Sequence, residues 1–133
     1  MKGTIIKYYQ QKMNIFDCGS IYYLRYCEIN YIYYDKPYTH VITIFNNDIL
    51  LNYSLIKFIE NLPNLFLFCN KSTILNSMHL KSLYKKNNYF LIVMENDKIF
   101  KVSRRKVYMI KEKLCQVKHA ILNCEICIIK QRM

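Results

Sequence analysis

The sequence contains few of the residues that bend or interrupt a chain. Only two Gly and two Pro occur among its 133 residues, and they are scattered. This scarcity excludes a flexible Gly- or Pro-rich linker, and no low-complexity segment or repeat of solenoid length is present. With 53% hydrophobic residues available for a core, we expect a single domain.

Acidic residues and long apolar runs are also scarce. Nine Asp and Glu stand against twenty Lys and Arg, giving a formal net charge of +11. This surplus favours a polyanion or an anionic membrane face as partner, although AT-rich coding, which inflates Lys, Asn, Ile and Tyr, would also account for it. No apolar run reaches the roughly 18 residues of a membrane span. The start of the chain, MKGTIIKYYQQK, lacks a signal-peptide core, so we expect a cytoplasmic protein without membrane insertion.

Six cysteines are expected to be reduced thiols in that compartment. The segment CQVKHAILNCEIC near the end of the chain could supply four ligands to a structural zinc ion: Cys115, His119, Cys124 and Cys127. Their spacing matches no standard zinc knuckle. We therefore favour ordinary cysteines in an apolar tail and expect no cofactor.

Catalytic patterns are absent. His40 lies within a strand-like run, His79 adjoins a Lys-rich stretch, and no spacing suggests a set of Ser, His and acid. With only Gly3 and Gly19, a phosphate-cradling glycine loop is excluded. We expect a protein that is not an enzyme.

Short runs of Tyr, Phe, Ile and Leu favour β-strands over most of the chain. Strands are predicted at residues 4–9, 21–26, 30–34, 38–45, 49–53, 65–69, 72–75, 80–84, 89–95 and 98–102. Asn- and Asp-containing turns separate several of them, at 46–48, 87–88 and 96–97. The segment SLIKFIENLP instead predicts one short helix, capped by Ser54 and closed by Pro63.

The end of the chain predicts an amphipathic helix that begins with two arginines. Apolar positions after Ser103 fall at helical intervals: Val107, Ile110, Leu114 and Val117. Ser103 is a suitable N-cap, which places Arg104 and Arg105 in the first turn, where the helix dipole disfavours each cation by about 0.3 to 1 kcal/mol. Two arginines at a helix start could bind a phosphate or a guanine edge. Alternatively, both side chains are simply solvated and the small electrostatic penalty is tolerated. Seven Lys and Arg against one acid in residues 98–113 favour a basic footprint.

Four segments resemble, in order and spacing, the LytTR (LytR/AgrA-type) DNA-binding domains of bacterial transcription regulators. The segments are EINYI at 28–32, SLIKFIENLP at 54–63, FLFCNKSTILN at 66–76 and VSRR at 102–105. The similarity runs from about Ile5 to Leu114. It implies an elongated antiparallel β-sheet fold with a short central helix and a C-terminal amphipathic helix, formed by residues 1–115. Residues 116–133 would be a tail of open role.

The resemblance also implies the function and the site. Loops of such domains enter successive major grooves of double-stranded DNA. Carried over by position, the DNA-binding residues are Lys36, Tyr38, Thr39, Asn70, Lys71, Arg104 and Arg105. Two positions depart from the family pattern, because Phe68 and Asn70 stand where Arg and His are usual. Lys71 lacks the bidentate geometry of Arg and suits a phosphate, so base specificity rests more on Arg105. Asn76 is expected to satisfy backbone groups in a turn.

Three functions remain open from the sequence. The first is a sequence-specific, double-stranded DNA-binding transcription regulator, here without a receiver domain, which would take its signal from a regulatory protein partner and could form a homodimer on DNA repeats. The second is a module for single-stranded nucleic acid, chiefly RNA, that uses Tyr33, Tyr34 and Tyr38 for stacking, although such tyrosines are more often half-buried packing residues. The third is a protein-interaction adaptor with a zinc-stabilised tail.

Overall fold

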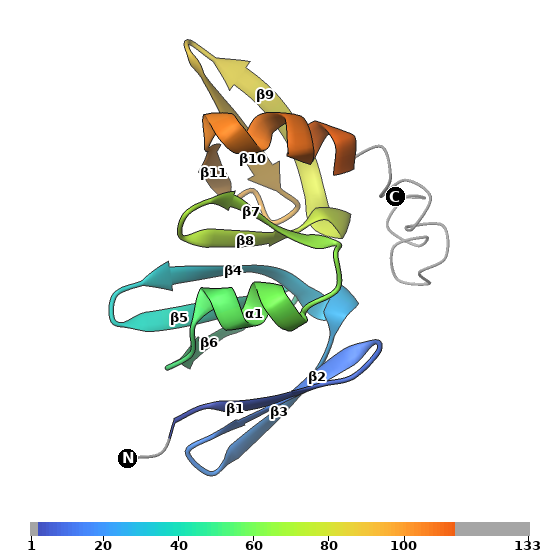
Figure 1. The fold of residues 1–133 in the computed structure, drawn as a ribbon, viewed down its shortest axis with the longest axis vertical. Coiled ribbons are helices and arrows are strands. Elements are labelled where there is room, and N and C mark those ends of the chain that lie inside the picture. Colours follow the sequence, from blue (N-terminus) through green and yellow to red (C-terminus); the bar gives the residue numbers. More distant parts are fainter. Residues whose placement is uncertain (1–2, 114–133) are drawn as a thin grey trace.

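Three antiparallel β-sheets follow one another along the long axis of the molecule (Figure 1). The computed structural model describes residues 3–113. Its strands are β1 (Ile5–Tyr8), β2 (Lys12–Asp17), β3 (Ser20–Arg25), β4 (Ile29–Asp35), β5 (Tyr38–Thr43), β6 (Asp48–Leu51), β7 (Phe66–Asn70), β8 (Thr73–Asn76), β9 (Leu80–Lys86), β10 (Tyr89–Met94) and β11 (Ile99–Val102). The N-terminal sheet has the order β1-β2-β3, the central sheet β6-β5-β4-β8-β7, and the third sheet β11-β10-β9. The predicted antiparallel β fold is confirmed.

Helical segments are short. The helix α1 (Leu55–Asn61) packs on β4, β7 and β8 of the central sheet. Ser54 caps it as predicted, because its Oγ accepts from the backbone N–H groups of Ile56 (3.1 Å) and Lys57 (3.5 Å). Single 3₁₀ turns lie at η1 (Tyr26–Glu28), η2 (Ser77–His79) and η3 (Arg104–Lys106). An α-helix follows η3 over residues 107–113 of the described chain, and we call it the C-terminal helix.

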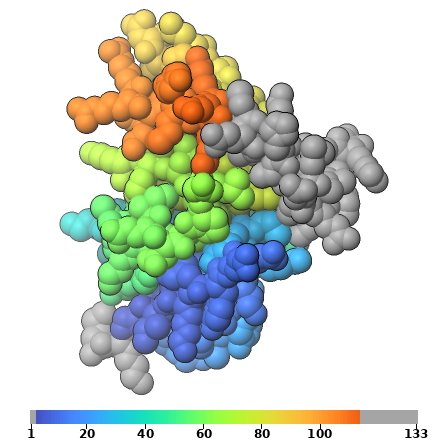
Figure 2. Space-filling model, turned by 45° about the vertical axis from the view of Figure 1, so that its right-hand side comes forward, coloured from blue at the N-terminus to red at the C-terminus, as the bar shows by residue number. Residues whose placement is uncertain are grey.

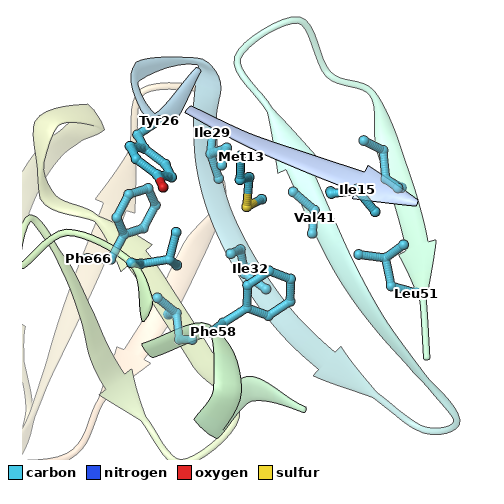
Figure 3. Close-up of a cluster of buried hydrophobic side chains, with 12 residues drawn as sticks. Met13, Ile15, Tyr26, Ile29, Ile32, Val41, Leu51, Phe58 and Phe66 are labelled. Carbon is cyan, nitrogen blue, oxygen red and sulfur yellow. The ribbon is translucent and has the colours of Figure 1, made fainter. Parts of the chain in front are cut away.

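The central sheet is buried on both faces, so its strands carry apolar residues in succession rather than in strict alternation. One face, which includes Ile32, packs against Met13 and Ile15 of the N-terminal sheet and against Phe58 of α1 (Figure 3). Those three partner side chains are fully buried. This cluster fixes α1 and the N-terminal sheet on the same side of the central sheet.

The opposite face of the central sheet packs against the third sheet and the C-terminal helix. Tyr31, adjacent to Ile32 in β4, belongs to this second cluster together with Ile92, Met94 and Ile110. Ile110 is fully buried, as expected from the helical spacing of the apolar residues after Ser103. Leu114 and Val117, the next two positions of that pattern, lie outside the described residues.

One strand, β2, is missing from the predicted set. It joins β3 through the two-residue turn Cys18–Gly19, in which φ is +48° and +85°. Positive φ at both positions is typical of a type I′ hairpin turn, usually marked by Asn or Asp before the Gly. The Cys–Gly pair gives a weaker signal, although Lys12 to Ile15 do alternate polar and apolar residues as a half-buried strand does. Every predicted strand is present, with ends shifted by at most two residues.

Candidate nucleic-acid interface

The first turn of the candidate interface, Lys36–Pro37, joins β4 to β5. Lys36 is exposed, and Tyr38 is 46% exposed, so both side chains are accessible to a partner. Thr39 differs, because only 1% of its surface is exposed and its hydroxyl donates to the Tyr53 carbonyl at 2.6 Å. The structure therefore places the predicted contact residue Thr39 inside the protein, where it holds the base of the turn.

The second turn joins β7 to β8 and is organised by Asn70. Its Oδ1 accepts from the backbone N–H of Ser72 at 2.9 Å and from the Ser72 hydroxyl at 3.1 Å. This is an Asx-type turn, a conformation that the Asn side chain favours. Lys71 lies exposed between the two residues. The side chain of Asn70 also donates to the Lys101 carbonyl of β11 at 2.9 Å.

The third segment runs from β11 through η3 into the C-terminal helix. The backbone N–H of Ser103 donates to the Cys69 carbonyl at 2.8 Å, which fixes the end of β11 against β7. Arg104 and Arg105 follow in η3, and both are exposed. The site residues predicted here are thus accessible.

The predicted side-chain cap of Ser103 is not formed. The Ser103 side chain makes no cap hydrogen bond, and its backbone carbonyl instead accepts from the Lys106 N–H at 2.8 Å. A 3₁₀ turn is closed by such a backbone bond over three residues, so no hydroxyl is needed. Arg104 and Arg105 consequently lie in a 3₁₀ turn that runs directly into the α-helix.

The three segments lie along one edge of the molecule. In Figure 1, the β4–β5 turn, the β7–β8 turn and the junction of β11 with the C-terminal helix all reach the left-hand side. Figure 2 shows projections in teal, light green and orange at that same edge. Segments separated by more than thirty residues in the sequence thereby form one continuous border.

The charges along this border are mostly positive, with Asp35 beside Lys36 as the acid of the first turn. Among residues 3–113, no ion pair includes Lys36, Lys71, Arg104 or Arg105. Charge is also concentrated at one end of the chain: residues 80–113 hold ten Lys and Arg against three Asp and Glu, whereas residues 3–79 hold six against five. Unpaired surface cations in such a field attract a polyanion.

Comparison with known proteins identifies the family of this chain. The LytTr DNA-binding domain family matches residues 19–115. A solved LytTr DNA-binding domain from Bacillus cereus superposes with a TM-score of 0.67 at 22% sequence identity, covering 79% of this chain and 97% of that domain. No protein of curated function matches the sequence. The chain belongs to the LytTR family of DNA-binding domains.

The folded LytTR domain extends in front of the family match. β1 and β2 precede residue 19, yet Met13 and Ile15 of β2 are fully buried in the cluster beneath the central sheet. The N-terminal hairpin therefore completes the core of this LytTR domain.

Within residues 3–113, no helix is both long and apolar enough to cross a bilayer.

Two departures from the family pattern have structural explanations in this LytTR domain. Phe68, where the family usually has Arg, lies beneath Lys106, whose Nζ is 5.8 Å from the centre of the ring. A cation is thus held over this position from η3. Asn70, where His is usual, uses its side chain for the hydrogen bonds to Ser72 and Lys101 described above.

The tyrosines considered for base stacking are not equivalent. Tyr33 stacks on the ring of His40, with centroids 4.6 Å apart and an angle of 3° between planes. Burial also raises the pKa of the Tyr33 hydroxyl. Tyr34 and Tyr38 are each 46% exposed. The described chain therefore offers exposed tyrosines on both sides of the first turn, and Tyr33 is a packing residue.

The zinc ligands considered above, Cys115, His119, Cys124 and Cys127, lie outside the described residues. Within residues 3–113, no group of three or more His, Cys, Asp or Glu is arranged to hold a metal ion. The described part of the LytTR domain thus presents basic and aromatic side chains for binding.

Proposed function

We propose that this LytTR domain is the sequence-specific, double-stranded DNA-binding part of a transcription regulator, and that its three segments contact the major grooves. One observation carries the proposal: three distant segments place exposed, unpaired cations along one edge of an elongated molecule. Duplex DNA presents phosphates along its whole length, and its major groove carries the base-specific hydrogen-bonding pattern. A row of loops suits such a ligand better than a single pocket does.

Each exposed residue then has a distinct role. Arg105 reads a base edge, because a guanidinium can make two parallel hydrogen bonds to guanine. Arg104 and Lys71 contact phosphates, for which a charge without base-reading geometry is sufficient. Lys36 and Tyr38 supply the contact of the first turn. Thr39 and Asn70 do not contact the DNA, because their polar side-chain atoms form hydrogen bonds within the protein.

Selection of bound duplexes from a random pool tests this proposal. Enrichment of one sequence motif is expected, and the selected duplex should bind more tightly than a shuffled duplex in anisotropy titrations. A steep fall of affinity with salt is expected as well, because phosphate contacts release counterions. A pool that yields no motif would contradict sequence-specific recognition.

Single-stranded nucleic acid is the second candidate, because Tyr34 and Tyr38 are exposed beside Lys36 and bases stack on aromatic side chains. The same titrations with single-stranded DNA and RNA of the selected sequence separate the two functions. Binding to a single strand as tight as to the duplex would favour the second candidate. A homodimer on DNA repeats and a regulatory protein partner stay predictions.

A further inference from the structure

The β7–β8 turn is bonded to both of the other DNA-facing segments. On one side, the Ser72 carbonyl accepts from the backbone N–H of Tyr34, which precedes the first turn, at 2.9 Å. On the other side, Asn70 Nδ2 donates to the Lys101 carbonyl of β11 at 2.9 Å. Lys101 lies two residues before Ser103, after which the two arginines follow. The three segments thus meet through residues 70–72.

Asn70 uses its whole hydrogen-bonding capacity inside the protein. A side-chain amide offers two N–H donors and one oxygen with two acceptor positions. Oδ1 accepts twice from Ser72, and Nδ2 donates to the Lys101 carbonyl and to the Cys69 sulfur at 3.5 Å. Only this orientation of the amide matches a backbone N–H on one side and a carbonyl on the other. No donor or acceptor of Asn70 is left for a nucleotide.

We infer that Asn70 is a positioning residue for DNA recognition: it fixes the segment carrying Arg105 relative to the first two turns, so that the domain accepts one spacing between the base pairs it reads. The inference rests on the proposed function. The link between the first and second turns is made by backbone atoms alone. The link to β11 combines the backbone bond from the Ser103 N–H to the Cys69 carbonyl with the side chain of Asn70. Removing that side chain leaves the backbone bond at Ser103 in place and loosens the arginine segment alone.

A spacing series tests this role with the full chain. Duplex selection with Arg105→Ala and with Tyr38→Ala first shows at which base pair each substitution relaxes the sequence preference. The selected duplex is then compared with versions in which one base pair is inserted or deleted between these two positions, and the resulting loss of affinity is called the spacing penalty. The wild-type protein should lose roughly tenfold or more in affinity on either change, because a rigid set of contacts cannot follow it. Asn70→Ala should bind the selected duplex roughly tenfold more weakly, yet lose only about threefold on changing the spacing.

Controls separate positioning from stability and from direct contact. Asn61→Ala removes an exposed amide that donates to the Lys57 carbonyl at 2.7 Å on α1, and should leave affinity and the spacing penalty at wild-type values. In an Arg105→Ala background, Asn70→Ala should have little further effect on the spacing penalty, since it acts through that arginine. If Asn70→Ala does not fold, Asn70→Ser carries the test, because its hydroxyl can accept from the Ser72 N–H but is too short to bridge to Lys101.

Several outcomes would overturn the inference while the wild-type protein still binds DNA. One is an Asn70 variant with the wild-type spacing penalty, at any affinity. Another is an Asn70→Ala substitution that changes the spacing penalty as much in the Arg105→Ala background as in the wild type, which would indicate that Asn70 contacts the DNA directly. A wild-type protein that binds no duplex would instead defeat the proposed function itself.

Discussion

The side-chain amide of Asn76 donates a hydrogen bond of 3.1 Å to the carbonyl of Tyr26, fifty positions earlier in the chain. The same Nδ2 donates to the Ile29 carbonyl at 2.9 Å, and Oδ1 accepts from the Met78 N–H at 3.0 Å. Asn76 is fully buried. One side chain thus joins η1, at the end of the N-terminal sheet, to the end of β8, and the structural role predicted for Asn76 is confirmed.

Asn76→Asp should destabilise the domain strongly. The substitution keeps the shape of the side chain but turns an oxygen toward the carbonyls of Tyr26 and Ile29, where Nδ2 now donates. We expect a loss of roughly 3 kcal/mol in the free energy of unfolding, because buried acceptors lose their donor and a charge is buried. Urea denaturation followed by circular dichroism measures this. Asn61→Asp on α1 is the exposed control and should cost less than about 1 kcal/mol.

Much of the fold follows from local patterns in the sequence. Tyr- and Ile-rich runs predict the strands because each strand must fill a pleated, largely buried surface. The SLIKFIENLP segment predicts α1 because Ser54 and Pro63 mark its two ends. The strand β2 is absent from the prediction because its alternation is short and the Cys18–Gly19 turn lacks the usual Asn or Asp before the Gly, although Met13 and Ile15 are buried in the core.

The site was predictable in part. The positions of Lys71, Arg104 and Arg105 on exposed segments agree with the sequence, because charged residues at turns stay in water. The burial of Thr39 and the internal bonds of Asn70 depend on partners fourteen and thirty-one positions away. No local pattern specifies such contacts. The Asx turn formed by Asn70 and Ser72 was not predicted either, nor was the bond from the Tyr34 N–H to the Ser72 carbonyl.

Two serines at helix starts should differ in their contribution to stability. Ser54→Ala should lower the free energy of unfolding by about 1 kcal/mol, because Ser54 Oγ accepts from two backbone N–H groups at the start of α1. Ser103→Ala should change it by less than about 0.5 kcal/mol, because the Ser103 side chain makes no cap hydrogen bond. Thermal or urea denaturation of both variants compares them directly. A larger loss at Ser103 than at Ser54 would contradict the 3₁₀ start of the C-terminal segment.

Arg105→Ala should reduce sequence discrimination. The loss of a bidentate base contact is expected to weaken binding of the selected duplex by roughly 1 to 3 kcal/mol and to relax the base preference at one position. Arg25→Ala is the matched control, since Arg25 is exposed at the end of β3 and pairs with Glu28. Repeating the duplex selection with both variants tests the assignment. An unchanged motif and affinity for Arg105→Ala would refute a base-reading role.

Lys71→Ala should weaken binding without changing the motif. Loss of one phosphate contact lowers the affinity for selected and shuffled duplexes alike and reduces the slope of log affinity against log salt by about one. Lys7→Ala in β1 is the control, because Lys7 lies over the Phe16 ring in the N-terminal sheet and should leave the slope unchanged. Titrations at several salt concentrations give both slopes. Equal slopes for Lys71→Ala and the wild type would argue against a phosphate contact.

Alkaline pH should destabilise the domain through Cys69. Burial raises the pKa of the Cys69 thiol from 9.0 to about 12. Between these values the folded state keeps a proton that the unfolded state releases, so the free energy of unfolding must fall as pH rises from about 9 toward 12. One such group lowers it by roughly 1.4 kcal/mol per pH unit once the unfolded thiol is ionised. Burial also raises the pKa of Tyr8, Tyr26 and Tyr33, whose contributions grow as the pH approaches and passes their ordinary value of 10.0.

Between pH 9 and pH 10 the tyrosines contribute as well, so the contribution of the thiol is the difference between the wild type and a variant that lacks it. Urea denaturation across this interval should show a shallower decline for Cys69→Ala than for the wild type, whatever the stability of each protein at pH 7. Cys18→Ala is the control, because Cys18 is exposed in the β2–β3 turn, and it should keep the wild-type decline. Identical declines for Cys69→Ala and the wild type would show that the thiol titrates equally in the folded and unfolded states. The burial of Cys69 against the third sheet requires the opposite result.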